Sequence, residues 1–227
     1  MRSWANTADD VLRRALWTTR PVDSSRAVLR LLVCLIVSGL LYGAVMGTFR
    51  GLAGHSQWQW QIVFSAVKVP MLLSVSFCLS LPSFFVLSTL LGLRRDFAQA
   101  VRSLVAAQTG LAITLTALAP ITLLWYASSA DYAAALLFNG IVFAAASLAA
   151  QFLLRGYSRP LVVRNPRHRI LLAYWGAVYI FVAIQFAWLL RPFIGSPNRE
   201  VQFLRPEAWD NAYVVVIRLV WRLLFGQ

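Results

Sequence analysis

Residues 132–154 read YAAALLFNGIVFAAASLAAQFLL, a stretch of 23 residues without a charged side chain. An α-helix rises 1.5 Å per residue, so this stretch spans about 35 Å, enough to cross a bilayer hydrocarbon core of about 30 Å. A strand of a transmembrane β-barrel needs only about ten residues, and these alternate between apolar and polar. The stretch therefore predicts a transmembrane helix and excludes a β-barrel.

Four further apolar runs reach spanning length, at residues 27–49, 69–93, 104–126 and 170–190. Together they predict an all-α fold, a polytopic transmembrane helix bundle with five spans and an amphipathic helix near each end. The chain then divides into three parts. These are a cytoplasmic leader (1–26), the five-span bundle (27–190) and an outer tail (191–227).

The composition agrees with a membrane protein. Apolar residues make up 59% of the chain and charged residues 13%, against about 25% charged in a soluble domain. The net charge of +13 indicates either a nucleic-acid partner or charge that sets membrane topology. Arginines concentrate in the leader and in the loops after residues 93 and 154, on one side of the predicted bundle, with Lys68 assigned to a loop on the other. This distribution predicts an inner (plasma) membrane protein with a cytoplasmic N-terminus, an outer C-terminus and no nucleic-acid partner.

Three segments outside the predicted spans are amphipathic. Residues 8–17 form a short helix that lies on the membrane surface or packs on the protein's own loops. The first loop, residues 54–64, alternates tryptophan with glutamine, a pattern typical of the headgroup layer. Residues 206–226 form an interfacial or groove-docked helix, with a sixth, tilted span as the alternative. The interfacial residues predicted from these segments are Trp58, Trp60, Trp209 and Trp221.

Glycines recur every four residues through the first span, at Gly39, Gly43, Gly47 and Gly51. A four-residue step keeps to one face of a helix, so the glycines form a stripe without side chains. Such a stripe lets another helix approach closely. The helix that packs there is either another span of the same chain or part of a second subunit.

Four amide side chains lie within the predicted spans, at Gln108, Asn139, Gln151 and Gln185. The topology places Asn139 and Gln185 at one depth, and Gln108 and Gln151 at another. Amides at matching depth can hydrogen-bond across helices, so each pair is predicted to be close in space. The alternative interpretation is a polar path for a transported substrate.

Residues 164–169 read RNPRHR and follow the fourth span. The basic side chains of this cluster are predicted to face lipid headgroups and to bind an anionic lipid. They are Arg164, Arg167, His168 and Arg169.

The residues that catalysis or ion coupling needs are missing from the spans. No Asp or Glu lies in any predicted span, which argues against proton-coupled transport. The sequence has no HExxH motif, P-loop or GxSxG motif, so we expect no enzyme activity, no cofactor and no metal site. Cys34 and Cys78 lie in apolar runs and are predicted to be buried thiols.

Residues 68–73 read KVPMLL and residues 81–92 read LPSFFVLSTLLG. These stretches resemble the second-span region of bacterial Yip1-domain-like membrane proteins. The resemblance extends loosely over residues 27–190, and it implies five spans with the N-terminus inside and the C-terminus outside. Eukaryotic Yip1 relatives, implicated in vesicle traffic, have an acidic DLYGP-type motif that this chain lacks, so the resemblance implies no such activity.

Taken together, the sequence predicts a non-enzymatic membrane subunit or scaffold that packs with other membrane proteins or with a second copy of itself. The predicted contact surfaces are the glycine stripe, the aromatic first loop and the tail helix. The alternative function is a small permease or channel with a polar path near Asn139, Gln151 and Gln185. A lipid-modifying enzyme is a third hypothesis, disfavoured because no nucleophile, base and acid can be assembled.

Overall fold

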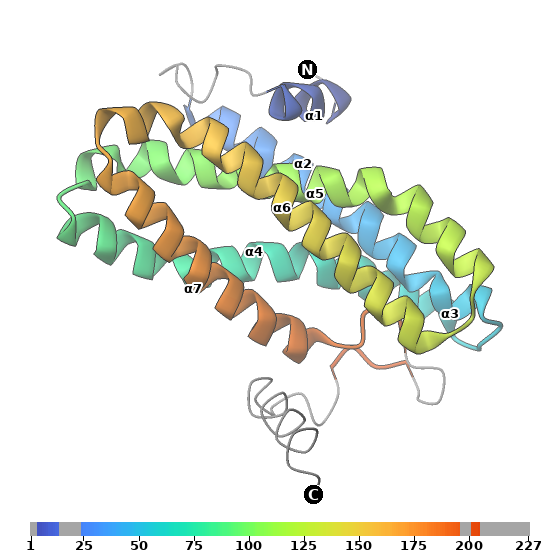
Figure 1. Ribbon diagram of the computed structural model, residues 1–227. Helices are drawn as coiled ribbons and strands as arrows, with labels where there is room; N and C mark the ends of the chain where they lie inside the picture. Colours follow the sequence, from blue (N-terminus) through green and yellow to red (C-terminus); the bar gives the residue numbers. More distant parts are fainter. Residues whose placement is uncertain (1–3, 14–23, 196–200, 205–227) are drawn as a thin grey trace, which may run out of the picture.

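The computed structural model describes residues 4–13, 24–195 and 201–204, and these residues form helices and connecting turns without a strand (Figure 1). The helices are α1 (Trp4–Leu12), α2 (Ser24–Gly47), α3 (Phe49–Leu52), α4 (Trp58–Leu90), the short 3-10 helix η2 (Arg94–Asp96), α5 (Phe97–Ser128), α6 (Tyr132–Arg164) and α7 (Arg167–Leu190). Five helical segments in the described part of the chain are long and apolar enough to cross a membrane. The predicted all-α bundle with five spans is therefore confirmed, and it has the build of an integral membrane protein.

The second spanning helix starts earlier than the hydropathy pattern predicts. Helix α4 begins at Trp58, after a turn in which Gly54 and Gln57 adopt positive φ angles of 76° and 60°. No proline or glycine interrupts the chain between Trp58 and Pro70, so the helix runs straight through the predicted loop. The prediction of a separate amphipathic loop is therefore wrong. Trp58 and Trp60 instead lie exposed in the first turn of α4.

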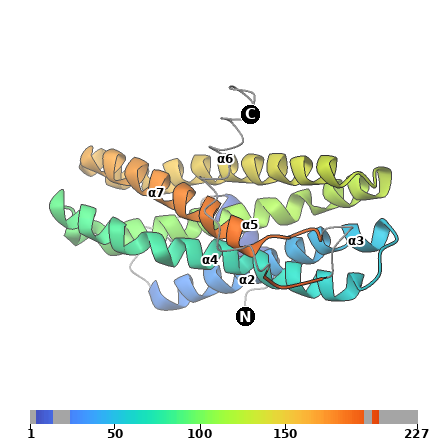
Figure 2. The same ribbon diagram turned by 90° about the horizontal axis from the view of Figure 1, so that it is seen from below.

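Neighbouring helices pack in the order α7, α4, α2, α5, α6. Helix α2 packs extensively on both α4 and α5, whereas α6 and α7 make little contact although a short turn joins them. Figure 1 shows α6 and α7 diverging from this turn, and Figure 2 shows the layers of the bundle from below. Helices α2, α4 and α5 thus form a floor, on which α6 and α7 stand as separate walls.

The two ends of the bundle differ in charge. One end, which we call the basic end, contains η2 and the turn between α6 and α7. The opposite end contains the turns before α4 and before α6, and residues 191–195 after α7. The arginines in and near the loops of the basic end are Arg94, Arg95, Arg102, Arg155, Arg159, Arg164, Arg167 and Arg169.

The glycine stripe of α2 lies directly against α4. A Cβ atom built at Gly43 would lie 2.3 Å from the backbone oxygen of Ser65, and one at Gly47 would lie 2.5 Å from Cα of Ile62. The remaining two glycines meet side chains of the same helix, with Gly39 at 3.0 Å from Pro70 and Gly51 at 3.2 Å from Trp58. The structure thus uses the stripe for contact between two spans of one chain. We call this contact the glycine seam.

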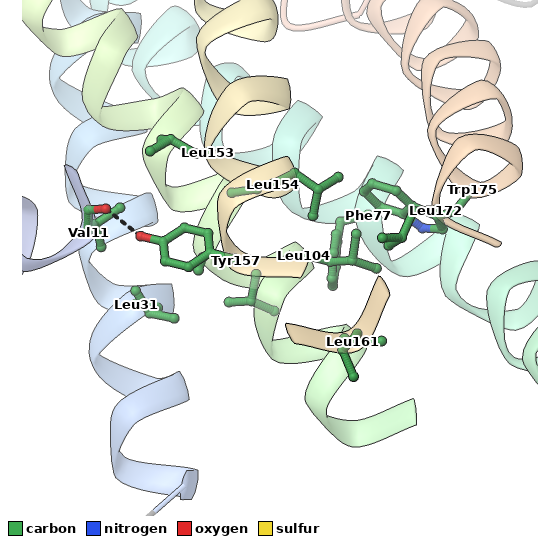
Figure 3. Close-up of a cluster of buried hydrophobic side chains, with 14 of the residues drawn as sticks. Val11, Leu31, Phe77, Leu104, Leu153, Leu154, Tyr157, Leu161, Leu172 and Trp175 are labelled. Carbon is green, nitrogen blue, oxygen red and sulfur yellow. Dashed lines mark hydrogen bonds between the residues drawn. The ribbon is translucent and has the colours of Figure 1, made fainter. Parts of the chain in front are cut away.

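Helix α1 packs on α2 and α5. The Tyr157 hydroxyl donates a hydrogen bond to the Val11 carbonyl (Figure 3), and Nε1 of Trp4 donates to Oγ of Ser38 at 3.3 Å. Val11 is completely buried in an apolar cluster with Leu31, Leu104, Leu153 and Leu161. The leader helix thus starts earlier than predicted and packs on the spanning helices, because its apolar side finds cover there.

The remaining predictions about exposure have mixed outcomes. Cys34 is buried but Cys78 is exposed, so the predicted burial of Cys78 is wrong. Cys78 lies on the outward side of α4, where apolar surface does not need protein cover if lipid surrounds it. Large apolar side chains are also exposed on other helices, at Leu124, Leu137, Leu148, Phe152 and Ile170. The predicted tail helix, with Trp209 and Trp221, lies outside the described residues.

Candidate functional site

An apolar cavity of about 360 Å³ lies between the diverging helices α6 and α7. Its floor includes Met46 of α2, Leu73 of α4 and Leu111 of α5. Its walls are built mainly from the apolar residues Leu136, Phe143, Ile180, Ala183, Ile184 and Ala187. Phe193 and Ile194 line it at the end of the bundle away from the basic end.

A second cavity, of about 590 Å³, lies between the same two helices at the basic end. Three arginines line it, with Arg155 and Arg159 on α6 and Arg169 on α7. Gln151 and Ser158 add polar groups, and the apolar part of its lining includes Leu154, Val162 and Leu172. This cavity is therefore cationic where the first is apolar.

The two cavities follow the same faces of α6 and α7. On α6 the lining residues are three or four positions apart, which keeps them on one side of a helix. On α7, Gly176 lies between Ala173 of the basic cavity and Ile180 of the apolar one, and a Cβ atom at Gly176 would meet no atom within 4 Å. The same is true of Gly140 on α6. We therefore treat the cavities as the basic half and the apolar half of one α6–α7 groove.

The three groove arginines have no acidic partner in the described part of the chain. None of Arg155, Arg159 and Arg169 forms a salt bridge there, and the guanidinium carbon of Arg155 lies 5.8 Å from the centre of the Phe152 ring. All three side chains are exposed to the groove or its surroundings. The basic half thus carries positive charge that no acidic side chain of the described residues neutralises.

A neighbouring basic cluster is neutralised by Asp96 of η2. One carboxylate oxygen of Asp96 lies 3.1 Å from Arg164, and the other lies 3.1 Å from Nε2 of His168. His168 is completely buried, so the prediction that it faces lipid headgroups is wrong. His168 lies in the first turn of α7 and points into the bundle, toward Asp96, the acidic residue of η2. Arg167 and Arg169 are exposed, but of the predicted cluster only Arg169 lines the groove.

Asn139 and Gln108 hydrogen-bond to tyrosines and not to the amides with which they were predicted to pair. The side-chain nitrogen of Asn139 donates to the Tyr126 hydroxyl at 2.6 Å, and its oxygen accepts from the Tyr42 hydroxyl at 3.3 Å. Gln108 donates to the Tyr179 hydroxyl and, at 3.3 Å, to the Leu73 carbonyl. The position of an amide along its helix sets its depth in the bilayer but not the direction of its side chain. Here Asn139 and Gln108 point toward tyrosine hydroxyl groups. Gln151 lines the basic half of the groove, and Gln185 is half-buried on α7.

Residues 191–195, which we call the strap, fold back against α4. Nζ of Lys68 donates to the Pro192 carbonyl at 2.8 Å, and Nε2 of Gln61 donates to the Phe193 carbonyl at 2.9 Å. The Ser65 hydroxyl also donates to the Phe193 carbonyl. These bonds hold Phe193 and Ile194 at the end of the apolar half.

Lys68 is completely buried within α4, so its assignment to a loop is wrong. A charged residue lowers the average hydropathy, so the hydropathy pattern places Lys68 at the end of a loop. Apolar residues, however, lie on both sides of it in the sequence. One signal was present in the sequence. Lys68 is the only lysine of a chain that otherwise uses arginine for every basic position.

Within the described residues, no group of three or more His, Cys, Asp or Glu side chains could hold a metal ion. No family model, no curated protein and no solved structure matches this chain. The resemblance to Yip1-domain-like proteins therefore stays a prediction, and function has to be argued from the α6–α7 groove itself.

Proposed function

We propose that this chain is a non-enzymatic integral membrane protein that holds a membrane lipid in the α6–α7 groove. The observation that carries this proposal is the lining of the groove, which is apolar over one half and cationic over the other. A phospholipid divides in the same way between acyl chains and headgroup. The cavity volumes of about 360 and 590 Å³ lie in the usual range for small-molecule sites, about 300–1,000 Å³.

The proposal includes an orientation. The excess of arginine at the basic end supports a cytoplasmic position for that end, by the positive-inside rule. Helix α2 begins at the basic end, so the proposed orientation includes a cytoplasmic N-terminus, in an inner (plasma) membrane. The bound lipid then belongs to the cytoplasmic leaflet.

The groove supports lipid binding better than transport. Its apolar half offers a polar substrate little besides Asn139, Ser147 and Tyr179. Asn139 is already bonded to two tyrosines, and the Tyr179 hydroxyl to Gln108. The strap residues Phe193 and Ile194 stand at the far end of that half. Both features favour a molecule that stays in place with its tail in the apolar half.

A second candidate is the predicted scaffold, in which a helix of a partner protein or of a second copy occupies the groove. Small residues along both walls favour it, because they allow close helix approach. These residues are Gly140, Ser147, Gly176, Ala183 and Ala187. The glycine seam no longer supports it, since α4 of the same chain covers that stripe.

Native mass spectrometry of the detergent-purified protein tests the proposal. The wild-type chain is expected to retain phospholipid, and the double variant Ser147→Leu/Ala183→Leu, which adds bulk to the lining of the apolar half on both helices, is expected to lose it. The matched control is Ala145→Leu/Ala177→Leu, which adds the same side chains to exposed positions of the same helices that do not line either cavity. Equal lipid retention by both double variants would contradict the proposal. A retained protein partner in place of lipid, lost on filling the groove, would establish the scaffold instead.

A further inference from the structure

We propose that the basic half of the α6–α7 groove recognises the phosphate of an anionic glycerophospholipid, through Arg155, Arg159 and Arg169. This inference rests on the proposed function and specifies the lipid class. Arg155 and Arg159 are one helical turn apart on α6, and Arg169 lines the same cavity from α7. The three guanidinium groups therefore converge on one space from two helices.

Charge in this cavity favours an anion. The three arginines line one cavity and carry like charges that repel one another, and no carboxylate in the described ranges pairs with any of them. The one nearby acid, Asp96, is already held by Arg164 and His168. A phosphate that enters the cavity relieves this repulsion, and arginine can bind its oxygens through two parallel hydrogen bonds.

The polar neighbours of the arginines do not compete for the phosphate. The Ser158 hydroxyl donates to the Leu154 carbonyl of its own helix at 2.7 Å. Gln151 lies one to two turns from the arginines toward the apolar half, at the level where a lipid has its ester groups. Its amide is suited to hydrogen-bond those esters. The recognition of charge therefore falls to the three arginines.

The groove is long enough to hold the acyl chain of a lipid of one leaflet. Half of a bilayer core is about 15 Å thick, which corresponds to about ten residues of α-helix. Measured from Arg155 along α6, that distance ends between Ser147 and Phe143, and measured from Arg169 along α7 it ends at Tyr179 and Ile180. A lipid with its phosphate at the arginines therefore lays its acyl chain past Gly176 into the apolar half.

The same charge discriminates between lipid classes. A zwitterionic phosphatidylcholine brings its own ammonium group, which three unpaired arginines repel. A phosphatidylglycerol has a phosphate without a second cation, so its net charge of −1 complements the cavity. Basic pockets between spanning helices on the cytoplasmic side are a known setting for anionic headgroups. We therefore expect preference for the anionic lipid at equal acyl-chain length.

The test is a native mass spectrometry titration of the full-length protein with phosphatidylglycerol and phosphatidylcholine that have identical acyl chains. We expect the wild-type protein to bind phosphatidylglycerol at least tenfold more tightly. The variant Arg155→Gln/Arg159→Gln/Arg169→Gln should lose this preference but still bind both lipids weakly through the apolar half. The control Arg94→Gln/Arg95→Gln/Arg167→Gln removes the same charge from exposed residues of the same end and should keep the preference.

The outcomes separate this inference from the proposed function. If the wild-type protein binds both lipids equally and filling the groove weakens both, the phosphate site is wrong and the lipid-binding groove stands. If filling the groove changes neither affinity, the proposed function fails as well. Equal loss of preference in the two triple variants would overturn the inference, because diffuse surface charge would then explain it. Thermal unfolding of each variant confirms that it is folded before the titration.

Discussion

The glycine seam and the α6–α7 groove are two helix contacts that contain glycines, and they have opposite character. In the seam, Gly43 and Gly47 press against the backbone of α4, at distances that leave no room for a methyl group. In the groove, Gly140 and Gly176 face open space. The glycines of α2 thus bring two backbones together, and those of α6 and α7 do not. Four glycines at four-residue steps make a continuous furrow, whereas single glycines in α6 and α7 leave the walls apart.

The largest expected effect comes from the seam, with the substitution Gly43→Ala. The new methyl group would lie 2.3 Å from the Ser65 oxygen and 2.8 Å from Cα of Ala66. Both atoms belong to the backbone of α4, so no side chain can turn aside and the two helices must separate. Overpacking of this kind costs about 1–3 kcal/mol or more. Unfolding of the purified protein in denaturing detergent should show the loss, and an unchanged midpoint would contradict the close contact.

A smaller effect is expected at the end of the groove, where Lys68 holds the strap. The substitution Lys68→Met keeps the apolar stem but removes the donor to the Pro192 carbonyl. A buried acceptor left without its partner costs about 1–3 kcal/mol, and the strap has two further donors, Gln61 and Ser65, that limit the damage. The expected result is a partly released strap and a groove that is open at this end.

Release of the strap can be followed at Ile194, which is 1% exposed. In a chain with Ile194→Cys and both native cysteines replaced by alanine, labelling by a membrane-impermeant thiol reagent should be faster with Lys68→Met than with Lys68. The variant Lys68→Arg retains a cation and serves as the control. Labelling at the same slow rate in all three chains would show that Lys68 does not hold the strap.

Much of the fold could be predicted because hydropathy reports directly on spanning length. Residues 132–154 contain no charge, and their helix begins at Tyr132 as predicted. The start of α4 could not be predicted in the same way. An average of hydropathy over a window is low around Trp58 and Lys68, because the polar side chains there lower it. The average does not show that Lys68 is bonded within the protein.

The candidate site was less accessible to sequence reasoning. Asn139, Gln151 and Arg169 were singled out individually, but the groove depends on which helices are neighbours. A turn as short as that between α6 and α7 would normally place two helices side by side. Here α7 packs on α4 instead. From the sequence alone, Arg155 and Arg159 are therefore interpreted as charge that sets the membrane topology. The cavity beside them, which the sequence does not reveal, is the basis for the proposed phosphate site.

The smallest expected effect comes from the groove, with the substitution Gly140→Ala. The added methyl group would meet no atom within 4 Å, so it creates no clash with the opposite wall. Alanine is about 1 kcal/mol more favourable than glycine inside a helix, so stability should stay the same or rise by up to that amount. The same detergent unfolding assay measures it beside Gly43→Ala. Because both variants add one methyl group to a glycine of a spanning helix, a loss of stability at Gly140 as large as that at Gly43 could not come from helix propensity. It would mean that α6 and α7 are in contact at this level, and that no groove separates them for a lipid to enter.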